Sequence, residues 1–556
     1  MKNTNLDVII KKKALGRQFE RKNVMRKLIV LGKEILSVNV MYGGSEPEKS
    51  ASEELKKYLG IVGIEVNEGA AFTFTCGIDA KVGYDGYAID VEEDSIRIVG
   101  GNGRGVLYGV YSFLEKYAGM RFFTPKIETY GKGDVVVNEG CSYVPTFEFR
   151  QSDWRCIHEK YWAVKNKVNH LNMPLPDELG SYSHYALYAH TMGRLCGTPH
   201  HLQPCLSDPE TLEMAKKNVR EILKNDPTCT LISVSQNDNQ NYCKCEKCAA
   251  VDEEEGSHMG TLLRFVNAIA DDIKDDYPHI VVDTLAYQYT RKPPKITKPR
   301  PNVCIRLCSI ECCFCHPLSD DTCERNAAFY RDIIGWNNIC ERIYVWDYVT
   351  NFGHYIQSFP NLSVLRDNMR FYASHHVKGM YPEGPHNATL SGEFGELKAY
   401  LLAKLMWEPF MSAEEYNTHI DEFMKAYYGE GWTYIRAYAD TVEALTKGHH
   451  MGIYAGSLTY IDAEKLEALE ETLDSWWDKA EELAGDKLEN VKRSRLQYRH
   501  VKLDLHPDAE KGRAFYNECL EKGVKWNEFI TVSPENIDFS KAPSTWADST
   551  MYRIGD

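Results

Sequence analysis

Short apolar runs in the middle of this chain repeatedly end in an acid or an amide. The clearest runs are Leu231–Ser235, Arg342–Trp346 and Val377–Pro382, which lead into Asp238, Asp347 and Glu383 respectively. A (β/α)₈ barrel gathers the carboxyl ends of its strands on one face, so acids far apart in sequence can surround one pocket. The pattern therefore predicts a barrel with carboxylates at its mouth, the groups that acid/base chemistry on a sugar requires.

Candidate strands alternate with helical stretches between residues 145 and 395. The strands predicted are Thr146–Arg150, Val168–Met173, His201–Leu206, Leu231–Gln236, Val281–Tyr287, Val303–Leu307, Arg342–Trp346 and Val377–Pro382. Helices are predicted between them, for example over Asp208–Lys224 and Gly260–Asp275. Eight such units over about 250 residues match a TIM-type barrel. A doubly wound open sheet is the competing fold, but no G-x-G-x-x-G follows any of the strands.

Two further domains are predicted, because 556 residues exceed what one hydrophobic core usually supports. Residues 25–125 contain strand-like runs and an amphipathic helix over Arg104–Tyr117, entered from a glycine-rich turn, and are predicted to form a small α/β domain. Residues 396–556 have helical spacing almost throughout and are predicted to form a C-terminal α-helical domain.

The composition of the chain indicates which kinds of ligand and which location the protein can have. A formal net charge of −15 argues against a nucleic-acid-binding surface. The 34 Tyr and 10 Trp suit a sugar-binding pocket, in which aromatic rings serve as flat apolar platforms, although most of these rings simply fill cores. No run approaches the ~20 apolar residues of a membrane span. Met1–Arg26 is basic and polar without the apolar segment of a secretory signal, so we expect a cytoplasmic protein.

Seventeen cysteines, an odd number at irregular spacings, fit reduced thiols better than a disulfide framework. Cys243, Cys245 and Cys248 form one tight cluster, C-K-C-E-K-C. These thiols could hold a structural zinc ion if His258 or a distant cysteine supplied a fourth ligand; otherwise they are ordinary thiols. We expect no other cofactor, and the sequence leaves a homo-oligomer open.

Three acids are the candidates for catalysis. Asp238 follows the fourth predicted strand among amide side chains that could fix its rotamer, and is the candidate general acid. Glu383, between a proline and a glycine after the eighth strand, and Asp347, after the seventh, are the candidates for base or nucleophile. Each could instead cap a helix or lie in a solvated loop, and we favour Glu383 over Asp347.

Further polar and aromatic residues lie at or near the predicted strand ends, where they could bind sugar hydroxyls or, through arginine, a carboxylate. Taken singly, each could equally be structural. The candidates for substrate binding are Arg150, His190, Asn237, Tyr287, Gln288, Arg306, Trp346, Tyr348 and Asn351.

At several of these positions the chain resembles a bacterial family of proteins of unknown function that join an α-glucuronidase-type N-terminal domain to a glycosidase-like barrel. The matching segments, between about residues 95 and 410, include R-G-V-L-Y-G-V-Y-S-F-L-E, S-V-S-Q-N-D-N-Q-N-Y-C-K-C-E-K-C and W-D-Y-V-T-N-F. The N-terminal segment is also similar to the accessory domain of family 20 hexosaminidases and family 67 α-glucuronidases.

The resemblance implies an exo-acting glycosidase whose acid, on strand four, falls on Asp238. Asn237-Asp238 is similar to the Asn-Glu pair of many barrel glycosidases, whereas family 20 enzymes carry an Asp-Glu pair and Asn239 follows Asp238 here. The expected substrate is a terminal sugar, with acidic and N-acetylated sugars as the candidates. The alternative is a carbohydrate-binding protein on a glycosidase-like barrel whose acids only hydrogen-bond hydroxyls.

Overall fold

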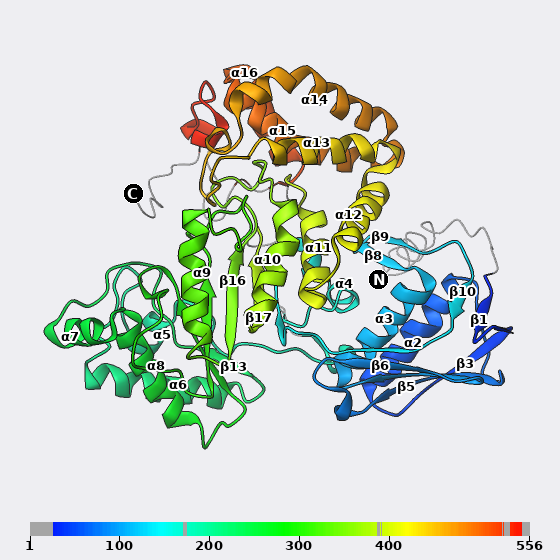
Figure 1. Cartoon of the computed structure of the whole chain (residues 1–556), viewed down its shortest axis with the longest axis horizontal. Helices are drawn as coiled ribbons and strands as arrows, with labels where there is room; N and C mark the ends of the chain where they lie inside the picture. The colour runs from blue at the N-terminus through cyan, green and yellow to red at the C-terminus, as the bar shows by residue number, and fades with distance from the viewer. Residues whose placement is uncertain are drawn as a thin grey trace, which may run out of the picture. The chain divides into compact units, whose positions relative to one another are not determined.

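The computed structural model describes residues 26–170, 175–385, 390, 392–524, 526 and 534–546 (Figure 1). Most of Met1–Arg26, where we expect no secretory signal, lies outside the described residues. The chain divides into two compact units, one formed by residues 1–121 and 130–143 and the other by residues 122–129 and 144–556. The predicted barrel region and the predicted C-terminal helices therefore belong to one unit.

The first unit is a small α/β domain with a six-stranded sheet in the order β11-β6-β7-β5-β3-β4 and a three-stranded sheet in the order β10-β1-β2. The helix predicted over Arg104–Tyr117 is confirmed as α3 (Gly103–Ala118), which the Asn102 side chain caps and Gly119 ends in the left-handed region, at φ 66°. The other elements are β1 (Leu28–Val30), β2 (Lys33–Ile35), β3 (Ser37–Tyr42), α2 (Glu46–Ile61), β4 (Glu65–Val66), β5 (Phe72–Ile78), β6 (Tyr87–Val91), β7 (Ser95–Gly100), β10 (Val135–Val137) and β11 (Cys141–Tyr143).

The second unit is built on a parallel sheet in the order β12-β17-β16-β15-β14-β13. These strands are β12 (Phe149–Arg150), β13 (Leu231–Ser233), β14 (Val281–Ala286), β15 (Val303–Cys308), β16 (Ile343–Tyr348) and β17 (Val377–Glu383). They confirm six of the eight predicted strands, with ends shifted by a few residues.

The other two predicted strands are not found in the described residues. The strand over His201–Leu206 is wrong, because the backbone there turns around the Asn237 side chain, which donates to the carbonyls of Pro199 (3.2 Å) and Leu202 (2.9 Å). Of Val168–Met173, residues 168–170 form no strand and residues 171–173 lie outside the described residues.

The sheet curls around one buried cation. Arg306 on β15 is 1% exposed, and its guanidinium lies 5.1 Å from the ring centre of Phe149 on β12 and 5.7 Å from that of Tyr344 on β16. Tyr185, paired with Leu231 of β13 by a parallel bridge, lies 5.3 Å from the same guanidinium. Phe149 of one edge strand and Leu231 of the other also belong to one buried cluster with Tyr344, so the sheet is strongly curved.

Irregular segments link the two edge strands by backbone hydrogen bonds. Asn169 N donates to Arg150 O of β12 (3.2 Å), and Ser183 N donates to Asn169 O (3.4 Å). Further along, Ala186 N donates to Leu231 O of β13 (2.9 Å). The described residues therefore contain a curved six-stranded sheet whose edges are connected through residues 169 and 183–187.

Helices cover the outside of this sheet and make up most of the described residues from 395 to 521. Figure 1 shows α9 and α10 running beside β16 and β17, and the helices predicted at Asp208–Lys224 and Gly260–Asp275 are confirmed as α6 and α8. Among the described residues, no helix is long and apolar enough to span a bilayer. The elements of this unit besides the sheet are β8 (Arg121–Thr124), β9 (Ile127–Thr129), α4 (Lys160–Lys165), α5 (Met192–Cys196), α6 (Pro209–Asn225), α7 (Glu246–Glu255), α8 (Met259–Ile273), α9 (Glu324–Asn337), α10 (Leu362–Ser374), α11 (Gly395–Trp407), α12 (Ala413–Tyr428), α13 (Trp432–Ala444), α14 (Ala463–Leu483), α15 (Leu488–Leu505) and α16 (Ala509–Glu521).

Candidate active site

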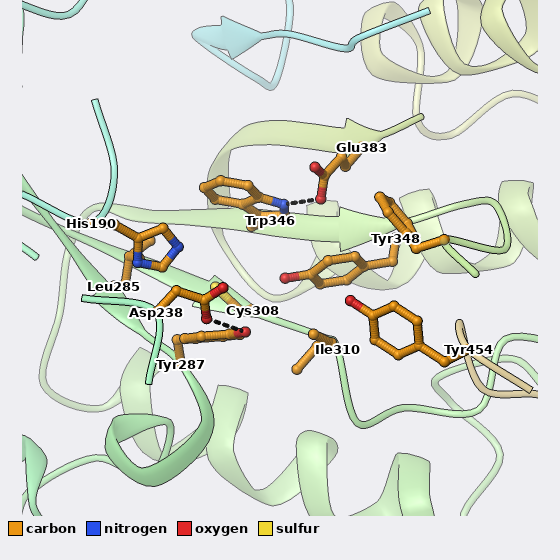
Figure 2. A pocket seen from close by; sticks show the side chains of 11 residues that line it. His190, Asp238, Leu285, Tyr287, Cys308, Ile310, Trp346, Tyr348, Glu383 and Tyr454 are labelled. Atoms are coloured by element: carbon orange, nitrogen blue, oxygen red, sulfur yellow. Dashed lines mark hydrogen bonds between the residues drawn. The ribbon is translucent and has the colours of Figure 1, made fainter. Parts of the chain in front are cut away.

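A pocket lies at the carboxyl end of the parallel sheet, on the face where barrel enzymes hold their substrates (Figure 2). Two acids, a histidine and five aromatic side chains are among its lining residues. The lining consists of His190, Asp238, Leu285, Tyr287, Cys308, Ile310, Trp346, Tyr348, Phe352, Glu383 and Tyr454. The structure thus brings together six residues predicted from the sequence: Asp238, Glu383, His190, Tyr287, Trp346 and Tyr348.

Glu383 is the last residue of β17 and is 6% exposed. Its Oε2 accepts a hydrogen bond of 2.7 Å from Nε1 of Trp346 on the neighbouring strand, drawn as a dashed line in Figure 2. The following residue must be small, because a Cβ on Gly384 would lie 2.5 Å from the Trp154 ring. Strand pairing, the indole N–H and this close approach therefore fix the position of Glu383.

Asp238 lies beyond the end of β13, is exposed, and faces the same pocket. The Tyr287 hydroxyl donates to its Oδ1 (3.1 Å) and accepts from Nε2 of Gln288 (2.9 Å). Burial and the nearby Asp238 charge raise the pKa of Tyr287, so that its hydroxyl keeps its proton and stays a donor. Gln288, a predicted substrate-binding residue, does not line the pocket and instead orients the tyrosine that holds Asp238.

The loop that carries Asp238 is held by amide side chains. Asn237 is fully buried, and besides its bonds to the turn at 199–202 its Oδ1 accepts from Gly193 N (3.3 Å). Gln203 donates to the carbonyls of Asn237 (2.7 Å) and Asn239 (2.9 Å). Asn237, predicted to bind substrate, therefore has its side chain committed to the scaffold.

His190 enters the pocket from a strained turn, with φ at 53° in a region that non-glycine residues rarely adopt. Its Nδ1 lies 2.9 Å from the carbonyl oxygen of Gln236. Because a carbonyl can only accept, Nδ1 carries a proton, and Nε2 is the ring nitrogen left for a ligand. The ring lies next to Asp238 in Figure 2.

Asp347 is placed outside the pocket lining. Side chains alternate along a strand, so Trp346 and Tyr348 line the pocket while Asp347, between them on β16, points to the opposite side. Asp347 is 4% exposed and accepts a hydrogen bond of 2.6 Å from the Ser309 hydroxyl. Burial raises its pKa to about 6, although the Ser309 hydrogen bond lowers it.

Three other predicted substrate-binding residues have structural partners and do not line the pocket. Arg306 forms an ion pair of 2.9 Å with buried Asp283. Arg150 is fully buried and donates to two backbone carbonyls. Asn351 donates to the carbonyl of Ala455 (2.9 Å) in the segment that carries Tyr454. Asn351 thereby supports the segment that carries the lining residue Tyr454, whereas the two arginines are committed to partners outside the lining.

Sequence reasoning missed five lining residues. Leu285 and Cys308 occur at predicted strand ends, where their position could have marked them, but their apolar character resembles ordinary core. Ile310, Phe352 and Tyr454 lie in loops, and Tyr454 comes from the connection between α13 and α14. No local pattern connects that distant segment to the strand ends.

The cysteine cluster gains a fourth member. All 17 cysteines are free thiols, and the sulfurs of Cys205, Cys243, Cys245 and Cys248 lie within 4.8 Å of one another. Cys205 Sγ is 3.7 Å from that of Cys245 and 3.8 Å from that of Cys248. Tetrahedral zinc with bonds of about 2.3 Å would separate its sulfurs by about 3.8 Å. His258, the other candidate ligand, instead contacts Asp252 (2.6 Å).

Comparison with known proteins identifies the family. A family model described as "Domain of unknown function (DUF4838)" matches residues 122–440, more than half of the chain, and the chain belongs to this family. The model of "Glycosyl hydrolase family 20, domain 2" matches residues 36–118 in the first unit. These matches confirm the resemblance inferred from the sequence. No curated protein matches the chain in sequence.

Solved structures of glycoside hydrolases are similar in fold. A family GH115 4-O-methyl-α-glucuronidase with specificity for decorated arabinogalactans is 12% identical over 91% of this chain and 79% of its own, with a TM-score of 0.52. A GH138 enzyme targeting pectin rhamnogalacturonan II is 11% identical over 93% and 97% of the two chains (TM-score 0.45). A β-N-acetylhexosaminidase from Bacteroides fragilis is 13% identical over 69% and 89% (TM-score 0.41). At 12% identity, the similarity to the GH115 enzyme shows a similar fold and says nothing about activity.

Proposed function

We propose that this protein is an exo-acting glycoside hydrolase on a (β/α)₈ barrel. The main support for this proposal is a pair of carboxylates that line one aromatic pocket at the carboxyl end of a curved parallel sheet. These carboxylates belong to Asp238, beyond β13, and Glu383, at the end of β17. In the proposed barrel, residues 168–170 and 183–187 occupy the second and third strand positions. This places Asp238 after strand four and Glu383 at strand eight.

The two carboxylates have different surroundings, which supports different roles. We assign Asp238 the role of general acid because it lies beyond the fourth strand of the proposed barrel, is open to the pocket mouth, and is oriented by the Tyr287 hydroxyl (3.1 Å). We assign Glu383 the role of base or nucleophile because it lies at the end of the eighth strand of the proposed barrel and is held in one position by the indole N–H of Trp346 (2.7 Å). Trp346, Tyr348 and the other rings would form the apolar platform for the sugar.

The charge of the lining favours a terminal sugar that carries no carboxylate. Among the described lining residues there are two acids and no Arg or Lys, and His190 is the one basic side chain. Arg306, a buried cation on β15, is already paired with Asp283. A uronic acid would therefore bring a third negative charge without a fixed partner, so a neutral sugar, N-acetylated sugars included, is the preferred substrate.

A panel of aryl glycosides, neutral, N-acetylated and uronic, tests the proposal with the purified full-length protein. We expect turnover of a neutral or N-acetylated glycoside, and a loss of kcat of roughly 10²–10⁴-fold in Asp238→Asn and Glu383→Gln with little change in Tm. Asp275→Asn, an exposed acid after α8, is the matched control. Binding without turnover would make the protein a carbohydrate-binding protein, and wild-type kcat in either pocket variant would remove that acid from the mechanism.

We also propose that Cys205, Cys243, Cys245 and Cys248 hold a structural zinc ion. The sulfur separations support this, as does the backbone N–H of Cys248, which points at Cys245 Sγ (3.5 Å) at the start of α7 and would stabilise a thiolate there. The ion would fix the segment after Asp238 to the turn at residues 199–205. The Cys243→Ser/Cys248→Ser variant should lose about one equivalent of zinc and melt at a lower temperature; unchanged zinc would contradict the site.

A further inference from the structure

A second cluster of thiol and imidazole groups lies in the two segments that also carry the pocket-lining residues Ile310 and Tyr454. One ligand atom each from Cys313, His316, Cys323 and His450 lies within 4.8 Å of the others. Three of these residues come from the loop between β15 and α9, and His450 comes from the connection between α13 and α14. We propose that these four side chains bind a zinc ion that fastens the two segments together.

The separations fit tetrahedral coordination by two sulfurs and two nitrogens. Cys313 Sγ lies 3.2 Å from Nδ1 of His316, and Cys323 Sγ lies 3.6 Å from Nδ1 of His450. Zinc bonds of about 2.3 Å to sulfur and 2.0–2.1 Å to nitrogen would place such atoms about 3.6 Å apart. Mixed thiolate and imidazole ligands in this geometry select zinc among the common divalent ions.

The loop that supplies three ligands is held in shape by protein contacts. Asn326 on α9 accepts from Cys313 N (2.8 Å) and donates to the carbonyls of Cys313 (3.2 Å), His316 (3.0 Å) and Pro317 (3.2 Å). The backbone N–H of Met451 points at Cys313 Sγ (3.4 Å), the kind of donor that stabilises a metal-bound thiolate. The ligands are therefore preorganised, and the outer contacts that such sites need are present.

The position of the site gives it a consequence for the pocket. Ile310 lies three residues before Cys313, Tyr454 lies four residues after His450, and both line the pocket. The backbone N–H of Phe352, a third lining residue, donates to the carbonyl oxygen of Ile453 (2.8 Å), next to Tyr454. A zinc ion at the cluster would fix Tyr454 against the loop that carries Ile310, so it would shape this rim of the pocket.

The zinc content of the full-length protein tests the site without any activity measurement. We expect His450→Ala to lose about one equivalent of zinc relative to wild type, and His449→Ala, a neighbouring histidine outside the cluster, to lose none. This difference does not depend on the zinc proposed at the four-cysteine cluster. If His450→Ala perturbs folding, cobalt substitution of the wild type and of Cys243→Ser/Cys248→Ser gives the second measurement, since the latter should still show the absorption of tetrahedral thiolate coordination.

Hydrogen exchange then measures the effect on the rim. Residues 449–456 should exchange faster in His450→Ala and after chelation, but not in His449→Ala. The consequence for substrate rests on the proposed glycosidase function, and there we expect a raised KM in His450→Ala. Unchanged zinc in His450→Ala, or no metal left in Cys243→Ser/Cys248→Ser, would overturn the site. If His450→Ala loses zinc but the wild type shows no detectable hydrolysis, the zinc site stands, and the result counts against the proposed glycosidase function alone.

Discussion

Replacing Asp347 by asparagine separates a buried structural acid from a catalytic one. Asp347 is the sequence-predicted acid that the structure places outside the pocket lining, 4% exposed beside Ser309. Asparagine has nearly the same shape, and its side-chain oxygen can still accept the Ser309 hydroxyl. The substitution therefore removes the charge and preserves the packing.

The pH dependence follows from the pKa of Asp347, which burial raises to about 6 in the folded protein. An aspartate in the unfolded chain has a pKa of about 3.9, so between about pH 4 and pH 6 the folded protein binds more of this proton than the unfolded chain does. Stability from this group is therefore present at low pH and is lost as the pH rises through 6. Two pKa units correspond to a cost of about 3 kcal/mol near pH 7.5 and about 1.5 kcal/mol at pH 5.

Asp347→Asn should consequently be more stable than wild type, and its advantage should grow by about 1.5 kcal/mol between pH 5 and pH 7.5. In a unit this large that growth corresponds to a Tm difference of about 1–2 °C. Thermal melts of both proteins at the two pH values measure it, with exposed Asp275→Asn expected to show no such growth. The kcat of the variant on a substrate found in the glycoside panel should stay within a few-fold of wild type.

Two outcomes would refute this reasoning. A Tm difference that is equal at both pH values, or that shrinks as the pH rises, would mean that Asp347 carries no penalty for its buried charge. A large loss of kcat in a variant that melts at or above the wild-type temperature would return Asp347 to the chemistry. The placement of its side chain away from the pocket would then be wrong.

Two further substitutions test how the two acids proposed to be catalytic are positioned. Tyr287→Phe removes the hydroxyl that donates to Asp238 (3.1 Å) and should lower kcat/KM roughly tenfold with little change in KM, the size of one lost hydrogen bond; an unchanged value would show that Asp238 needs no such support. Gly384→Ala places a Cβ 2.5 Å from the Trp154 ring and should displace Glu383. We expect a large loss of kcat with a small decrease in Tm, and a wild-type kcat would show that the pocket tolerates this shift.

Most of the fold was predictable where strand and helix signals are local. The six confirmed strands are short runs rich in β-branched and aromatic residues, and α3, α6 and α8 have clear helical spacing. The predicted strand at His201–Leu206 was wrong because a non-local contact decides that region. The buried amide of Asn237 draws the carbonyls of residues 199 and 202 toward itself, and this competes with strand pairing.

The candidate site was predictable to the extent that it consists of strand ends. Glu383, Trp346 and Tyr348 follow from the parallel sheet alone, since its carboxyl ends meet on one face. The period of two along a strand also implies that Trp346 and Asp347 cannot both face the pocket, so the aromatic residue and the acid were alternatives. The sequence does not say which of the two alternating sets of side chains faces the pocket. In the structure it is the set with Trp346 and Tyr348.

What the sequence could not supply are contacts closed by distant segments. Cys205 joins Cys243, Cys245 and Cys248 across about 40 residues, and His450 approaches Cys323 across 127. Both clusters lie next to loops that shape the pocket, one beyond Asp238 and the other between Ile310 and Tyr454. Loops at the mouth of a barrel have little hydrophobic core of their own to hold them. Crosslinks by bound metal would give such loops the rigidity that orienting two carboxylates on a sugar demands.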